Sequence, residues 1–155
     1  MQTKTIKKSI EISTSKEAVW QVLIEDNFTR NWYAEFSEGS HAETDWKKGS
    51  KAIFTDNSKC GMVAKVIENK PYELIDLEYE GVVKDGAEDY ESEIAKQVKG
   101  GHETYRLTEE NGTTQLSIAC DMAEDYFETM SLAWDKALVK IKSLAESIGE
   151  KEPAF

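Results

Sequence analysis

The longest regular pattern in the chain lies near its C-terminus, where apolar residues recur at intervals of three and four. Between Glu124 and Ile148 they occupy positions 126, 127, 130, 134, 137, 138, 141, 144, 145 and 148. This pattern predicts one amphipathic helix of about 25 residues, about 37 Å long at 1.5 Å per residue, and Gly149 is expected to end it. Such a helix can bury its apolar stripe only against an equally long partner, and a curved sheet is the available one.

The residues before this helix predict strands, interrupted early by two short helices. Ile6, Ile10 and Ile12 alternate with polar residues and indicate a strand over 4–12. Thr14 and Glu17 have the spacing of a capping box, which predicts that a helix begins there. A second short helix is expected over 28–36, followed by strands at 40–45, 51–55, 60–69, 72–80, 105–107 and 116–122.

The expected fold class is therefore α+β. An antiparallel sheet of six or seven strands curves around the long C-terminal helix, and two short helices follow the first strand. The charged segment 84–99 carries Tyr90, Ile94 and Val98 at spacing four, which indicates a loop with a short helix. Two interpretations of this segment stay open, a lid over a pocket or a plain surface helix.

Composition narrows the class of protein. A length of 155 residues fits one domain over 1–155, and no run of about 18 apolar residues predicts a membrane span. The formal charge of −11 disfavours nucleic-acid binding. The N-terminus lacks the apolar core of a signal peptide, so a cytoplasmic location is expected. Cys60 and Cys120 lack the spacing of metal ligands; buried thiols are expected, with a disulfide or redox pair as the alternative.

Several segments resemble one protein family. The stretch IEISTSKEAVWQVL at 10–23 resembles the start of the START-like superfamily, which includes the Bet v 1-type proteins. Trp32, the WKKG turn at 46–49, and the segments 61–75 and 103–116 are similar to the branch related to the activator of Hsp90 ATPase. The resemblance implies a helix-grip fold with a cavity for apolar or amphipathic small molecules between sheet and C-terminal helix. Relatives include lipid carriers, polyketide cyclases, co-chaperones and stress-related proteins, and the fold does not choose among them.

Ten large side chains are the candidate lining of such a cavity. They come from the two short helices, from the inward positions of the strands and from the first half of the C-terminal helix. In sequence order they are Trp32, Phe36, Phe54, Met62, Tyr79, Tyr105, Met122, Phe127, Met130 and Trp134. The alternative is that they simply fill the core, as aromatic residues and methionine commonly do. Leu138, Ile141 and Leu144, further along the helix, are expected to pack tightly.

Evidence for catalysis is weaker. The only histidines, His41 and His102, have no neighbouring nucleophile or second metal ligand and are expected at the surface. Asp76, Glu78 and Glu80 alternate with apolar residues and should face solvent. No metal, cofactor or catalytic residue is therefore assigned.

Three functions stay open. The first is a carrier or sensor of a small hydrophobic ligand. The second is a cyclase or hydrolase using Tyr79, Tyr105 or His102 in the same cavity, which requires a buried ionisable group facing the ligand. The third is a protein-interaction domain with a chaperone as partner, and a monomer or a homodimer suits each function.

Overall fold

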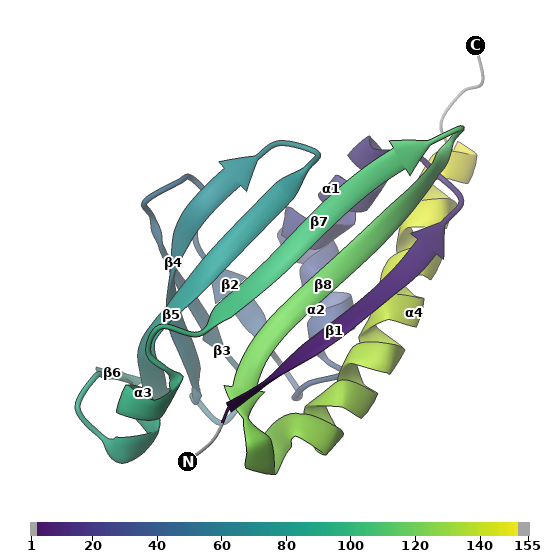
Figure 1. Ribbon diagram of the computed structural model, residues 1–155. Coiled ribbons are helices and arrows are strands. Elements are labelled where there is room, and N and C mark those ends of the chain that lie inside the picture. Colours follow the sequence, from purple (N-terminus) through teal and green to yellow (C-terminus); the bar gives the residue numbers. More distant parts are fainter. Residues whose placement is uncertain (1–2, 152–155) are drawn as a thin grey trace.

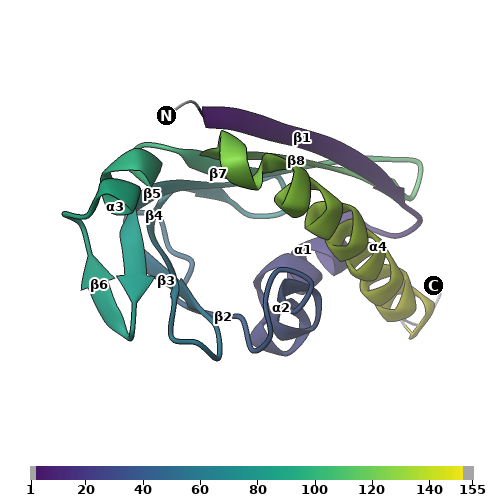
Figure 2. The same ribbon diagram turned by 90° about the horizontal axis from the view of Figure 1, so that it is seen from below.

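An antiparallel sheet curves around a long C-terminal helix in the computed structural model, which describes residues 3–151 (Figure 1, Figure 2). The helices are α1 (Lys16–Ile24), α2 (Asp26–Tyr33), α3 (Glu93–Val98) and α4 (Phe127–Lys151), and a 3-10 turn, η1 (Glu124–Tyr126), precedes α4. The strands are β1 (Thr3–Ile12), β2 (His41–Glu43), β3 (Lys51–Thr55), β4 (Gly61–Lys70), β5 (Leu74–Lys84), β6 (Ala87–Asp89), β7 (His102–Glu110) and β8 (Thr113–Ala123). Their order across the sheet is β1-β8-β7-β5-β4-β3-β2, with β6 paired to β5. The predicted α+β helix-grip fold is confirmed.

Among the described residues, no helix is long and apolar enough to cross a membrane.

The concave face of the sheet carries the inward side chains of each long strand. On β5 these are Ile75, Leu77 and Tyr79, which are at most 7% exposed. The residues that alternate with them, Asp76, Glu78 and Glu80, are partly exposed, as the alternation predicted. Helices α1, α2 and α4 cover this face, whereas α3 and β6 lie at the opposite end of the curved sheet (Figure 2).

The second half of α4 belongs to the solid core. Ala137, Leu138, Ile141 and Ala145 are at most 4% exposed, and Leu144 is partly buried against them. Burial of a side chain the size of leucine or isoleucine is worth about 1.5–3 kcal/mol, so this half anchors the helix. Trp32 adds a second connection, because its indole N–H donates to the Val22 carbonyl over 3.0 Å and links α2 to α1.

The start of α1 differs from the prediction. Ser15, not Thr14, caps the helix, and its side chain accepts a hydrogen bond from the Ala18 N–H over 3.3 Å. Thr14 is instead buried, and its carbonyl accepts a hydrogen bond from the Thr114 hydroxyl over 2.8 Å. This tertiary contact fixes Thr14 to β8, so the next residue supplies the cap.

The expected end of α4 at Gly149 is also wrong, because the helix continues to Lys151. Gly149 serves close packing instead: a Cβ atom at this position would lie 2.2 Å from Oγ1 of Thr14. The absence of a side chain lets the last turn of α4 approach the segment between β1 and α1.

The outer face of the sheet holds His102 between two carboxylates. Its Nδ1 lies 2.8 Å from Oδ1 of Asp76, and its Nε2 lies 3.5 Å from Oε2 of Glu78. The hydrogen bond with Asp76 raises the pKa of His102 above its usual 6.5, with partial burial opposing and the charges of Asp76, Glu78 and Asp121 adding to the increase. His102 is therefore a surface residue in an ion-pair cluster, as expected.

Substitution at Gly149 tests the close contact. Gly149→Ala should lower the free energy of unfolding by about 1–3 kcal/mol, the usual cost of overpacking, although alanine is the better helix former. Urea unfolding measures the change, with Ser143→Ala on the exposed side of α4 as the control. The loss should shrink in a Thr14→Ala background, where Oγ1 is absent. A more stable Gly149→Ala protein would contradict the contact.

The His102 cluster predicts a pH-dependent contribution to stability. A pKa that folding raises stabilises the folded state below the unfolded value of about 6.5, and the gain is lost as the pH rises through the folded value. His102→Gln should therefore destabilise the protein more at about pH 5.5 than at about pH 9 in urea unfolding experiments. The difference between the two pH values should diminish in an Asp76→Asn background. An equal loss at both would show that the imidazole charge is not involved.

Candidate ligand-binding cavity

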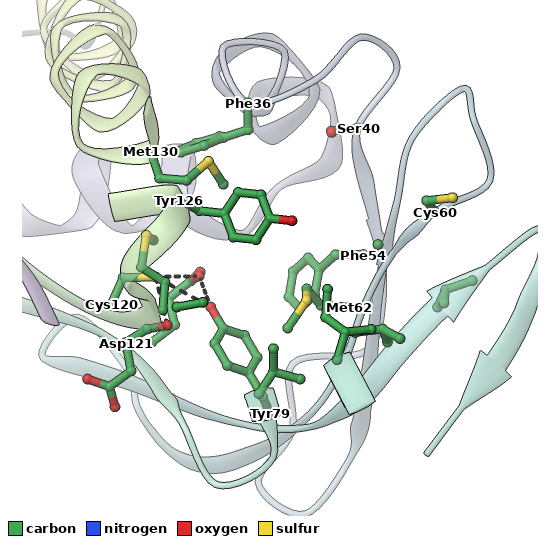
Figure 3. Close-up of a pocket in the computed structure, with 18 of the residues that line it drawn as sticks. Phe36, Ser40, Phe54, Cys60, Met62, Tyr79, Cys120, Asp121, Tyr126 and Met130 are labelled. Atoms are coloured by element: carbon green, nitrogen blue, oxygen red, sulfur yellow. Dashed lines mark hydrogen bonds between the residues drawn. The ribbon is translucent and has the colours of Figure 1, made fainter. Parts of the chain in front are cut away.

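A cavity of about 660 Å³ lies between the concave face of the sheet and the first half of α4 (Figure 3). Side chains of β3, β4, β5, β7 and β8 form one side, and α2, η1 and α4 form the other. Ile94 and Tyr126, which are 46% and 55% exposed, mark where the cavity reaches solvent. The hollow therefore begins where the tight packing of the second half of α4 ends.

Nine of the ten candidate residues lie together in the lining. They are Trp32, Phe36, Phe54, Met62, Tyr79, Tyr105, Met122, Met130 and Trp134. Strand parity and helical spacing were sufficient to bring these distant residues into one group.

Phe127 is the exception, because it does not line the cavity. The Lys4 ammonium lies 5.3 Å from the centre of its ring, and Tyr126 occupies the lining instead. Residues 124–126 form a 3-10 turn whose last residue is Tyr126, whereas Phe127 is the first residue of α4. The spacing of the apolar residues did not show which of these two adjacent aromatic residues lines the cavity.

An aromatic cluster closes one end of the cavity. The ring of Trp134 lies 4.9 Å from that of Phe36, 5.9 Å from Tyr105 and 6.0 Å from Trp32, measured between centroids. Trp32 and Trp134 are at most 2% exposed, so they belong to the core and to the cavity wall at once. Such aromatic pairs add about 0.5–1.5 kcal/mol each beyond burial, so we expect this wall to be rigid.

Flexible side chains form much of the remaining wall. Met130 lies on the helical side of the cavity and Met62 on the sheet side, and both are partly exposed (Figure 3). Methionine adapts its shape because it is unbranched and has a polarizable sulfur. These parts of the wall can therefore change their shape.

The main polar feature is Glu103, which the sequence interpretation missed. The Tyr79 hydroxyl donates to Oε1 of Glu103 over 2.6 Å, and the Tyr105 hydroxyl donates to Oε2. The thiol of Cys120 lies 3.6 Å from Oε1. A usable signal existed, because Glu103 shares the parity of the inward residues Tyr105 and Leu107 on β7.

Burial keeps the neighbours of Glu103 protonated. It raises the pKa of Tyr79 and Tyr105 well above the usual 10, and the negative charge of Glu103 adds to the increase. The pKa of the Cys120 thiol is raised well above 9 for the same two reasons. The two phenols are therefore neutral hydrogen-bond donors at physiological pH.

The two cysteines have different environments. Both are free and both line the cavity. Cys120 is buried, as predicted, but Cys60 is only partly buried because it lies in the turn before β4. Within residues 3–151, no group of three His, Cys, Asp or Glu side chains could hold a metal ion.

The segment 84–99 contributes a wall of the cavity. It contains β6 and α3, and Ile94 and Val98 of α3 line the cavity. Ala95 is fully buried, so α3 is packed onto the sheet rather than free of it. Tyr90 precedes the helix and lies outside the lining, which breaks the predicted set at spacing four. Movement of this segment as a lid stays a prediction.

Solved structures share this architecture. The Aha1 dimer of Colwellia psychrerythraea is 17% identical, with a TM-score of 0.70 over 92% of this chain and 96% of that chain. A protein of Mesorhizobium loti, MLL2253, is 13% identical, with a TM-score of 0.70 over 97% of this chain and 100% of that chain. CalU16 of Micromonospora echinospora is 14% identical, with a TM-score of 0.64 over 96% and 85%. These likenesses support the fold alone.

Sequence comparison gives the family. A search of curated proteins finds no significant match. The sequence model of one family, described as Activator of Hsp90 ATPase homolog 1-like protein, matches residues 13–146. Because this match spans most of the chain, the chain belongs to the Activator of Hsp90 ATPase homolog 1-like family, as the resemblance of its segments predicted.

Proposed function

We propose that this protein binds a small apolar or amphipathic molecule in the cavity, as a carrier or sensor. The observation that carries the proposal is a hollow of about 660 Å³ with a largely aromatic and methionine lining. Ligand sites in proteins commonly span about 300–1,000 Å³ and combine apolar walls with a few polar groups. Protein interiors are otherwise close-packed, with few voids larger than a water molecule.

The contrast along α4 supports the same proposal. Ala137, Leu138, Ile141 and Ala145 are at most 4% exposed and belong to the core, whereas Met130 and Trp134 line the cavity. One helix therefore has an anchoring half and a half that lies over the cavity. A helix needed only for stability gains nothing from the second arrangement, because unfilled volume costs packing energy.

The enzymatic alternative keeps two of its three candidate residues in the cavity wall, but in a form that disfavours base catalysis. His102 lies on the outer face of the sheet, away from the cavity. Tyr79 and Tyr105 do line it, but their raised pKa values keep both hydroxyls protonated and unsuitable as bases near neutral pH. The chaperone-partner hypothesis rests on the family resemblance, and no feature of the described surface specifies such a partner.

Filling the cavity tests the proposal. Met62 and Met130 lie on opposite walls, so the double variant Met62→Trp/Met130→Trp should weaken binding of the neutral probe N-phenylnaphthylamine by about tenfold or more. Probe fluorescence during titration measures the affinity.

A matched control carries the same substitutions on outward positions of the same elements. Lys65 on β4 and Lys136 on α4 are exposed, so Lys65→Trp/Lys136→Trp should retain native affinity. Circular dichroism shows whether each variant is folded. A native protein that binds no probe, or a folded filled variant that binds as well as native, would contradict the proposal.

A further inference from the structure

The carboxylate of Glu103 lines the cavity without a cationic partner. Across residues 3–151, no Lys, Arg or His nitrogen lies within 4.0 Å of its oxygens, although ten other ion pairs occur. Lys84 is the only basic residue in the lining, and it is exposed at the end of β5. Glu103 is only partly exposed, and a charged group with reduced access to water is costly unless a partner compensates it, so the missing partner is the feature to explain.

The hydrogen bonds of Glu103 leave room for another donor. An ionised carboxylate offers about four acceptor positions. Tyr79 and Tyr105 occupy one on each oxygen, and the Cys120 thiol makes a weaker contact with Oε1. All three donors belong to strands of the sheet, and Tyr79 and Cys120 meet on the floor of the cavity (Figure 3). Glu103 itself lines the cavity, so a further donor can reach it from there.

A purely structural role explains this arrangement less well. Two buried phenols need an acceptor, but a glutamine side chain or a backbone carbonyl would satisfy them without placing a charge in the cavity wall. The charge is felt along this wall, because it contributes to the raised pKa values of Tyr33, Tyr79, Tyr105 and Cys120. Asp89 and Asp121 also line the cavity, so this part of its wall is electronegative.

We propose that the ligand is a cationic amphiphile whose protonated amine lies against Glu103 while its apolar body occupies the space between Met62 and Met130. This inference rests on the proposed function and adds the chemical class of the ligand. It also implies that the cavity rejects carboxylates of the same size, because like charges would meet without compensation. The formal charge of −11 on the chain also attracts cations and repels anions over longer distances.

Three probes with one ring system and different head groups test the inference. Naphthylmethylamine, naphthylmethanol and naphthoate should bind in that order of affinity by isothermal titration calorimetry at about pH 7, where the amine is charged. The amine should bind about tenfold or more tightly than the carboxylate, the effect expected for a hydrogen bond to a charged partner. This comparison uses the native protein and does not depend on any variant folding.

The variant Glu103→Gln locates the preference. It should weaken amine binding by about tenfold while changing alcohol affinity by less than about threefold. Glu110→Gln, at an exposed position of the same strand, is the matched control and should leave all three affinities as in the native protein.

The outcomes separate this inference from the proposed function. Alcohol binding without a preference for the amine over the carboxylate would overturn the cationic ligand but leave the cavity as a binding site. An amine preference that survives in folded Glu103→Gln would also overturn it. If none of the three probes binds, both proposals fail together.

Discussion

Contact between α4 and the concave sheet determines both the stability and the hollow of this protein. The sheet is wider than the stripe of α4 can cover, so one helix cannot fill the whole concave face. Small and branched residues such as Ala137, Ile141 and Ala145 let the second half of α4 approach the sheet, and these residues are fully buried in the core. At the first half, long side chains such as Met130 stand between helix and strands and border a cavity. The difference in side-chain size along one helix is thus sufficient to divide core from cavity.

Most of this arrangement could be predicted because it depends on periodicity. A strand that buries one face must alternate, and a helix that buries one stripe must repeat at three and four. Applied to β5 and α4, these rules gave the right faces and brought nine of ten candidate residues into one lining. The predictions that were wrong depend instead on contacts between distant segments. Gly149 ends no helix because it packs on Thr14, and Ser15 caps α1 because Thr14 is fixed to Thr114.

Glu103 and Phe127 show two different limits of the same rules. Phe127 was misplaced because Tyr126, the last residue of the 3-10 turn before α4, lines the cavity instead, and no residue type marks such a turn in the sequence. Glu103 was overlooked because a charged residue is assumed to face solvent, although its parity pointed inward. An acidic residue at an inward position of a strand is a local inconsistency, and such inconsistencies are expected at functional sites. Here the inconsistent residue supplies the cavity with a carboxylate that accepts hydrogen bonds from two buried phenols and has no cationic partner among residues 3–151.

A crystal structure of the protein, purified without denaturation, is the most direct test, because it reports the packing of both halves of α4 at once. We predict tight packing around Ile141 and an open volume between Met62 and Met130, with electron density for a small molecule that reaches Glu103. A closed volume, with the first half of α4 packed against the sheet as tightly as the second, would contradict this prediction.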